Sequence, residues 1–302
     1  MQLSSPACRR HVIGSAAACA GVLGLLAGCT PPQPEPTPIV VQNQSTWAMP
    51  LDEFKVFDPS LSNYAEQLLI AKCLEGQGYE WPVPWQDTDF AQTETVNDSA
   101  LKIFNLDIAR RFGYHDAPPP NPADVVAWTE FTTWANAYDP DEQFRSRFDG
   151  CGEDARSDKT VAAADGLNYI ASLEIQARDE VSSMDAVRDA ARMWRSCLSE
   201  FVTFELPNDP WGEMPTLEMA QQYGIYGHNL TEVASPDELS AAEADARCRD
   251  SSGYTEARYR AEWSAQETLV TNNRDKLDRI RDEAVAHTDE LKTLIAQNAP
   301  TR

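Results

Sequence analysis

The chain has 302 residues, of which 42% are hydrophobic, so it can bury the core of one large domain or two modest ones. Its formal net charge at pH 7 is −23. Because an acidic surface repels phosphate backbones and anionic headgroups, this charge argues against nucleic acid as a partner and against direct adsorption to a membrane surface.

The N-terminal segment, residues 1–28, has the three parts of a bacterial export signal. Two arginines at 9–10 precede an apolar run at 12–26, which ends in Leu26-Ala27-Gly28-Cys29, a sequence with the form of a lipobox. We therefore predict cleavage before Cys29 and attachment of acyl chains such as palmitate to this cysteine. An ordinary cleavage site beside an incidental cysteine is the alternative. The arginine pair leaves the export route open between the Sec and the twin-arginine pathways.

Residues 29–46 are predicted to form an extended tether, because five prolines lie between 31 and 38. At about 3 Å per residue, such a segment reaches roughly 50 Å. Removal of the signal takes away Arg9 and Arg10 and no acidic residue, so the formal charge changes from −23 to −25. No later segment has 18 consecutive apolar residues, so the lipid is the expected membrane attachment of an extracytoplasmic protein.

Seven cysteines are present. Cys8 and Cys19 belong to the export signal, and Cys29 is the predicted lipidation site. The remaining four are Cys73, Cys151, Cys197 and Cys248. An even number in an exported protein predicts two disulfides, with three possible connectivities. Their spacing is too open for a zinc site, so we expect no metal.

Two stretches of the mature chain share landmarks in the same order, which predicts an internal duplication. The matching segments are Cys73-Leu74 and Cys197-Leu198, 79–85 and 204–211, 106–113 and 217–224, and 121–124 and 235–238. We therefore predict two related helical units, residues 47–183 and 184–302. A duplicated unit would carry its own disulfide, which favours pairing Cys73 with Cys151 and Cys197 with Cys248. Disulfides between the units are the alternative.

Helical periodicity dominates between these landmarks, so the predicted fold class is mainly α. Residues 161–181 lack proline and are predicted to form one helix. From Thr255 the chain lacks glycine and proline up to Pro300, which predicts a long C-terminal helix. Apolar residues recur seven apart at Trp263, Val270, Leu277, Ala284 and Leu291. Because polar residues interrupt the companion positions, we expect this helix to pack on the protein's own body instead of forming a coiled-coil dimer.

Strand signals are short and lie at equivalent places in the two predicted units. They are Gly78–Val83 and Phe201–Leu206, with aromatic and β-branched residues. We predict that the two segments pair as a small antiparallel β-ribbon.

Four residues of these loops are candidate ligand contacts: Glu80, Trp85, Glu205 and Trp211. The two glutamates are matched by the duplication and resemble the carboxylate pair of a glycosidase. The tryptophans, with Trp81, offer surfaces on which sugars could stack. The alternative, which we favour, is that the carboxylates accept hydrogen bonds from loop amides and that the tryptophans pack on a helical core.

Other chemical signals are weak, and we assign no catalytic residue and no cofactor. Ser99-Ala100-Leu101-Lys102 has the Ser-x-x-Lys form of penicillin-interacting enzymes, but no Lys-Thr-Gly completes that site. His115 and His228 follow matched glycines and could bind a metal or act as a base. Each lacks a partner at a recognisable spacing, which favours a loop or capping role.

The second unit resembles a group of uncharacterised secreted lipoproteins of high-GC Gram-positive bacteria. The resemblance rests on the lipobox, the proline-rich tether, Trp194-Arg195-Ser196-Cys197-Leu198 and Ala244-Asp245-Ala246-Arg247-Cys248, and it is clearest over 185–265. A glycine that usually follows the first cysteine is kept at Gly78 and is missing after Cys197. Because the group has no assigned activity, the resemblance implies location and lineage only.

Together these signals predict a non-enzymatic binding or interaction module, anchored by lipid at the cell envelope. Its expected partners are the membrane, through the lipid, and either peptidoglycan or an envelope protein. A wall-acting hydrolase that uses Glu80, Glu205 or a histidine is the first alternative. A solute-binding lipoprotein is the second, although such proteins need alternating strands and helices that the sequence lacks.

Overall fold

A computed structural model describes residues 40–89, 94–97, 101–118, 122–161 and 166–301. The chain divides into two compact units, 1–37 and 38–302, and every described residue belongs to the second. The predicted export signal, the lipidation site Cys29, most of the tether and Ser99 lie outside the described residues.

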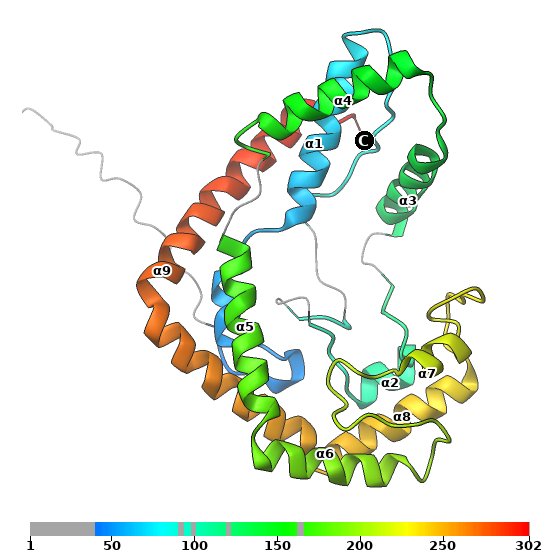
Figure 1. Cartoon of the computed structure of the whole chain (residues 1–302), viewed down its shortest axis with the longest axis vertical. Helices are drawn as coiled ribbons and strands as arrows, with labels where there is room; N and C mark the ends of the chain where they lie inside the picture. The colour runs from blue at the N-terminus through cyan, green and yellow to red at the C-terminus, as the bar shows by residue number, and fades with distance from the viewer. Residues whose placement is uncertain (1–39, 90–93, 98–100, 119–121, 162–165, 302) are drawn as a thin grey trace, which may run out of the picture. The chain divides into compact units, whose positions relative to one another are not determined.

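The described residues are mainly helical, which confirms the predicted fold class (Figure 1). Two short 3-10 helices, η1 (Gln44–Thr46) and η2 (Pro50–Phe54), come first. The α-helices are α1 (Pro59–Glu75), α2 (Leu106–Phe112), α3 (Pro122–Ala137), α4 (Glu142–Ser157), α5 (Gly166–Ser182), α6 (Asp185–Leu198), α7 (Leu217–Gln222), α8 (Pro236–Ser251) and α9 (Tyr254–Asn298).

Side-chain caps fix where several of these helices begin. The Asp58 carboxylate accepts a hydrogen bond from the Ser60 amide (2.8 Å) at the start of α1. The Asp141 carboxylate does the same for the Phe144 amide (2.8 Å) in α4, and the Ser235 hydroxyl for the Glu238 amide (3.2 Å) in α8. Each cap satisfies a backbone donor that the helix leaves unpaired, and contributes about 1 kcal/mol.

The long C-terminal helix is confirmed as α9, which has 45 residues and follows Gly253 in the left-handed conformation. It packs against η2, α1, α5, α6 and α8, and Figure 1 shows it running beside α5 and α1. Leu277, Ala284 and Leu291 are buried in these contacts. The apolar heptad positions therefore face the protein's own helices, as predicted.

Both disulfides join helices. Cys73 of α1 is bonded to Cys151 of α4, and Cys197 of α6 is bonded to Cys248 of α8. This is the pairing that the sequence favoured. The first bond fixes α1 against α4, and the second fixes α6 against α8.

The predicted β-ribbon is wrong. All residues of Gly78–Val83 and Phe201–Leu206 are described, and neither segment forms a strand. One aromatic residue of each segment packs on another part of the protein instead, while Phe201 is 64% exposed. Tyr79 contacts Phe144 of α4 with ring centroids 5.4 Å apart, and Phe204 contacts Tyr223 at 5.8 Å. Proline at 82 also removes a backbone donor that a ladder would need.

Two predicted boundaries also differ. Residues 43–48 fold back through a bridge between Asn43 and Ala48, so the extended tether predicted to run to 46 ends earlier. The helix predicted to begin at 161 is α5, which begins at Gly166, while Val161 lies in a turn. A Cβ at Gly166 would lie 2.3 Å from Cγ2 of Ile280, so glycine permits α5 and α9 to approach closely here.

Helices from the two predicted units pack on one another. Helix α2 contacts α8, and α9 contacts α1 and η2. The matched landmarks also do not occupy equivalent helices. Pro122 begins α3 and Pro236 begins α8. The second cysteine of the first unit, Cys151, lies one helix later, on α4, whereas Cys248 lies on α8 itself. The internal duplication stays a prediction.

Candidate functional site

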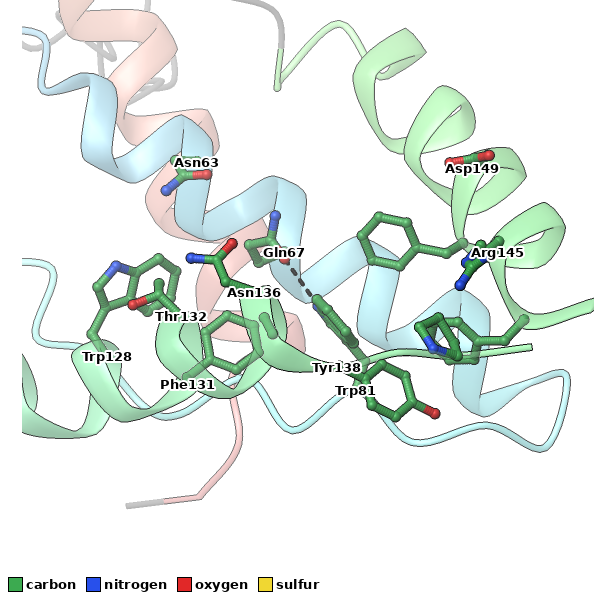
Figure 2. Close-up of a pocket in the computed structure, with 14 residues that line it drawn as sticks. Asn63, Gln67, Trp81, Trp128, Phe131, Thr132, Asn136, Tyr138, Arg145 and Asp149 are labelled. Carbon is green, nitrogen blue, oxygen red and sulfur yellow. Dashed lines mark hydrogen bonds between the residues drawn. The ribbon is translucent and has the colours of Figure 1, made fainter. Parts of the chain in front are cut away.

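A cleft of about 500 Å³ lies between α1, α3 and α4, with Trp81 of the loop after α1 in its wall (Figure 2). We call it the aromatic cleft. Its aromatic lining residues are Trp81, Trp128, Phe131, Tyr138, Phe144 and Phe148. Its polar lining residues are Asn63, Gln67, Thr132, Asn136, Arg145 and Asp149.

The loop after α1 is fixed to the helices on both sides. The Tyr79 amide donates to the carbonyl of Leu74 (3.0 Å), and the side chain of Val83 is buried. The Gln86 amide donates to the hydroxyl of Tyr64 (3.1 Å), and its side chain donates to the carbonyl of Asp124 in α3 (3.2 Å). These bonds hold Trp81 between α1 and α3.

Trp81 is the centre of the aromatic lining. Its ring centroid lies 5.5 Å from that of Phe131, 5.2 Å from Trp134 and 4.8 Å from Phe148. The indole N–H donates to Oε1 of Gln67 (2.9 Å), which is the hydrogen bond drawn in Figure 2. Aromatic pairs at such distances add about 0.5–1.5 kcal/mol each beyond their buried area. The cleft wall is therefore held in place before any ligand arrives.

Two aromatic side chains at the edge of the cleft remain accessible. Trp134 is 37% exposed and Tyr138 is 41% exposed, although their rings stack with centroids 5.0 Å apart. Tyr138 also contacts Phe144 edge-on at 5.2 Å, which links the end of α3 to α4. Large aromatic surfaces that stay exposed beside a cleft are typical of binding sites.

The polar lining has hydrogen-bonding groups that the described protein does not use. Among the described residues, the side chains of Asn63, Asn136 and Asp149 have no hydrogen-bond or ion-pair partner, and all three are exposed. Arg145, in contrast, donates to Oδ1 of Asp139 (2.6 Å). The cleft therefore offers amides and one carboxylate, while its cation is already paired.

The four predicted contact residues are not brought together. Glu80 is exposed and lines a separate groove beside α1 and the C-terminal end of α9, with Lys72 and Asn298. Trp85 is half-buried in the same loop, outside the lining of the aromatic cleft. Glu205 is exposed in the loop after α6, next to Phe204, which packs on Tyr223. The structure therefore does not bring Glu80 and Glu205 together as the carboxylate pair that a glycosidase of the common type would need.

Trp211, the fourth of these residues, packs inside the protein. Its ring stacks on Trp47 at 4.8 Å and lies 5.0 Å from the guanidinium of Arg258. Arg258 is itself 1% exposed and pairs with Asp209 at 3.3 Å. Trp211 therefore covers a buried arginine, in agreement with the packing role that the sequence favoured.

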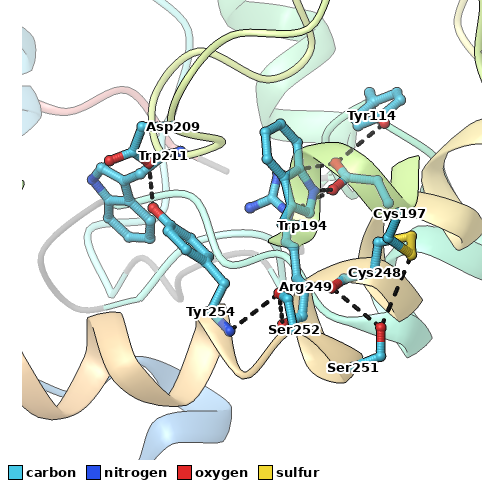
Figure 3. Close-up of polar contacts among 11 residues, drawn as sticks. Tyr114, Trp194, Cys197, Asp209, Trp211, Cys248, Arg249, Ser251, Ser252 and Tyr254 are labelled. Carbon is cyan, nitrogen blue, oxygen red and sulfur yellow. Dashed lines mark hydrogen bonds and ion pairs between the residues drawn. A yellow bond between two sulfur atoms is a disulfide. The ribbon is translucent and has the colours of Figure 1, made fainter. Parts of the chain in front are cut away.

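A second buried polar cluster surrounds Asp245 of α8, which is fully buried. Figure 3 labels three of its members, Tyr114, Trp194 and Arg249. The Asp245 carboxylate accepts hydrogen bonds from the indole of Trp194 (2.7 Å), from the hydroxyl of Tyr114 (3.2 Å) and from Arg249 (2.8 and 3.0 Å). Burial raises the pKa of Tyr114 well above its usual value. Because Asp245, Tyr114 and Trp194 are buried and hydrogen-bonded to one another, the cluster joins α6 and α8 to the loop after α2.

The two candidate histidines differ. His115 places Nδ1 2.9 Å from Oε1 of Glu238 and Nε2 3.2 Å from the carbonyl oxygen of Thr231. It thereby connects the loop after α2 to the start of α8, which is the loop role that the sequence favoured. His228 is exposed in the loop before α8. Lys102, the lysine of the Ser-x-x-Lys pattern, donates a hydrogen bond to the carbonyl of Tyr114 (2.6 Å).

Within the described ranges, no group of three or more His, Cys, Asp or Glu side chains is placed to hold a metal ion. Likewise, no helix among the residues that the model describes is long and apolar enough to cross a membrane. Comparisons of this chain with protein-family models, with curated proteins and with solved structures found no match.

Sequence reasoning missed most of the aromatic cleft. It singled out Trp81 but none of the aromatic residues of α3 and α4. Two signals were present: Trp128, Phe131 and Trp134 are spaced three apart, and Phe144 and Phe148 are spaced four apart. Both spacings place side chains on one helical face, but a buried core face has the same pattern.

Proposed function

We propose that this protein is a lipid-anchored module of the bacterial cell envelope, akin to the secreted lipoproteins of high-GC Gram-positive bacteria, and that it binds an envelope component in the aromatic cleft. The lipobox at Cys29 and the export signal before it support the location. The two disulfides support an oxidising compartment.

The aromatic cleft carries the binding part of the proposal. It combines the accessible ring of Tyr138, beside which Trp134 lies at the edge, with three polar side chains, Asn63, Asn136 and Asp149, that have no partner among the described residues. Binding without chemistry fits this lining better than glycoside hydrolysis, because among the described residues the lining has a single carboxylate, Asp149, and a single cation, Arg145, which is paired with Asp139. Glycosidases of the common type require two carboxylates across the scissile bond.

A duplicated origin of the helical units belongs to the same proposal. It is supported by the two disulfide-bonded helix pairs, α1 with α4 and α6 with α8. In each pair the first cysteine lies near the end of its helix, at Cys73 and Cys197.

Photo-crosslinking in living cells tests the function. A photoreactive amino acid would replace Asn136, which is exposed in the aromatic cleft, in the full-length lipidated protein. The control position is Ile175 of α5, which is 51% exposed and lies outside the cleft. We expect a covalent adduct with an envelope component from position 136 only, and Tyr138→Ala should reduce its yield. Equal adducts from both positions, or none from position 136, would refute the proposed function.

A further inference from the structure

We propose that the ligand of the aromatic cleft is a neutral oligosaccharide made of pyranose rings. This inference rests on the proposed function of the same cleft and names the chemical class that it binds. It follows from three features of the lining: accessible aromatic faces, uncommitted polar groups and the sign of the charge.

The aromatic surfaces match the apolar faces of pyranose rings. A sugar ring presents C–H groups on its faces and hydroxyls around its edge, so it packs flat on an aromatic ring while the edge stays polar. Tyr138 is the accessible aromatic residue of the lining, at 41% exposure. Trp134, at 37% exposure, lies beside it at the edge of the cleft, with its ring centroid 5.0 Å from that of Tyr138 and 5.2 Å from that of Trp81. The Trp81 indole is oriented by Gln67, so little ordering is required when a sugar binds.

The polar lining matches the edge of such a ring. The side-chain amides of Asn63 and Asn136 each supply donors and an acceptor, and the Asp149 carboxylate supplies acceptors. None of the three has a hydrogen-bond partner among the described residues. An acyl chain would desolvate these groups without replacing their hydrogen bonds, at a cost of about 1–3 kcal/mol for each group buried. A ligand with several hydroxyls avoids that cost.

The charge selects neutral sugars over acidic ones. Arg145 is the only cationic residue of the lining, and it is engaged by Asp139 at 2.6 Å. Asp149 adds a negative charge to the cleft, and the whole chain has a formal charge of −23. A polymer of uronic acids or polyol phosphates would be repelled by these negative charges, and among the described lining residues the one cation that could offset them, Arg145, already shares its charge with Asp139. The volume of about 500 Å³ lies within the usual range for ligand sites and accommodates a short stretch of a glycan chain.

Calorimetric titration of the purified full-length protein with defined tetrasaccharides tests this inference. The neutral probes are chitotetraose, which has acetamido groups, and cellotetraose, which has hydroxyls only. The acidic probe is a tetrasaccharide of uronic acids. We expect at least one neutral probe to bind and the acidic probe to bind more weakly. The neutral probe that binds more tightly shows whether the cleft prefers acetamido sugars or plain hexoses.

Matched variants locate the binding. Tyr138→Ala and Asn136→Ala should each weaken neutral binding by about 3- to 10-fold, which corresponds to the loss of one stacking contact or one set of hydrogen bonds. Tyr226→Ala, at a tyrosine that is 61% exposed in the loop before α8, should change nothing. Near-ultraviolet circular dichroism checks that each variant is folded.

Three results would overturn the inference: no binding of either neutral probe, acidic binding as tight as neutral binding, or neutral binding that both cleft variants leave unchanged. Failure of the neutral probes while position 136 still forms its adduct in cells would reject the sugar class and leave the proposed function standing. Absence of that adduct would reject the proposed function itself.

Discussion

At the scale of single residues, buried polar side chains connect segments that lie far apart in the sequence. Glu238 is fully buried, and its Oε1 lies 2.8 Å from the Tyr114 amide and 2.9 Å from Nδ1 of His115. Trp211 lies over the buried Arg258. The sequence singled out His115 and Trp211, but a packing role and a binding role use the same residue types, and only the folded contacts separate them.

Gly113 provides a test at this scale, because it adjoins the carboxylate of Glu238. It has φ of 62°, and a Cβ there would lie 2.5 Å from Oε1 of Glu238. We expect Gly113→Ala to lower the free energy of unfolding by at least about 2 kcal/mol, since it combines backbone strain with displacement of a buried hydrogen-bonded carboxylate.

The matched control is Gly78→Ala. Gly78 also has a positive φ, 83°, but a Cβ there would meet no atom within 4 Å. It should cost only the backbone strain, about 1 kcal/mol. Urea denaturation of both variants measures the difference, and equal losses would show that Gly113 has no special relation to Glu238.

At the scale of elements, local signals predicted the helices and did not predict how segments pair. Helical periodicity predicted helices between the landmarks, and the absence of glycine and proline predicted α9, because these signals lie within each helix. The ribbon failed because Tyr79 packs on Phe144 of α4 and Phe204 packs on Tyr223, directly after α7, and alternation along a segment does not encode such contacts. The aromatic cleft was missed for the same reason, since Phe131 and Phe144 meet around Trp81 only after α3 and α4 fold beside α1.

The disulfides provide the test at this scale. Replacing Cys73 and Cys151 together by serine should lower the free energy of unfolding by about 4 kcal/mol, because the bond closes a loop of 78 residues in the unfolded chain. Replacing Cys197 and Cys248 should cost about the same, since that loop spans 51 residues and the cost grows only slowly with length.

Denaturation of both double variants, with and without a reductant, gives the measurement. The wild-type protein should lose stability on reduction, whereas each variant should lose only the part that belongs to its remaining bond. Four free thiols in the unfolded, unreduced wild-type protein would contradict both pairings.

At the scale of the whole molecule, the sequence predicted a helical, disulfide-bonded protein, and the described residues have that character. It did not predict that helices of the two proposed units would pack on one another, as α2 does on α8. Such packing follows from tertiary contacts between distant segments, which repeated landmarks in the chain do not specify. The location of the protein rests on residues 1–29, which lie outside the described residues.

That location is tested most directly at Cys29. Membranes of cells producing the wild-type chain or Cys29→Ala would be separated from the medium, and the N-terminal peptide of the mature protein would be weighed by mass spectrometry. We expect the wild-type protein in the membrane fraction with acyl chains on Cys29, and the variant uncleaved or shed, because two or more acyl chains are needed for stable attachment. An unmodified Cys29 on wild-type protein released into the medium would contradict the account.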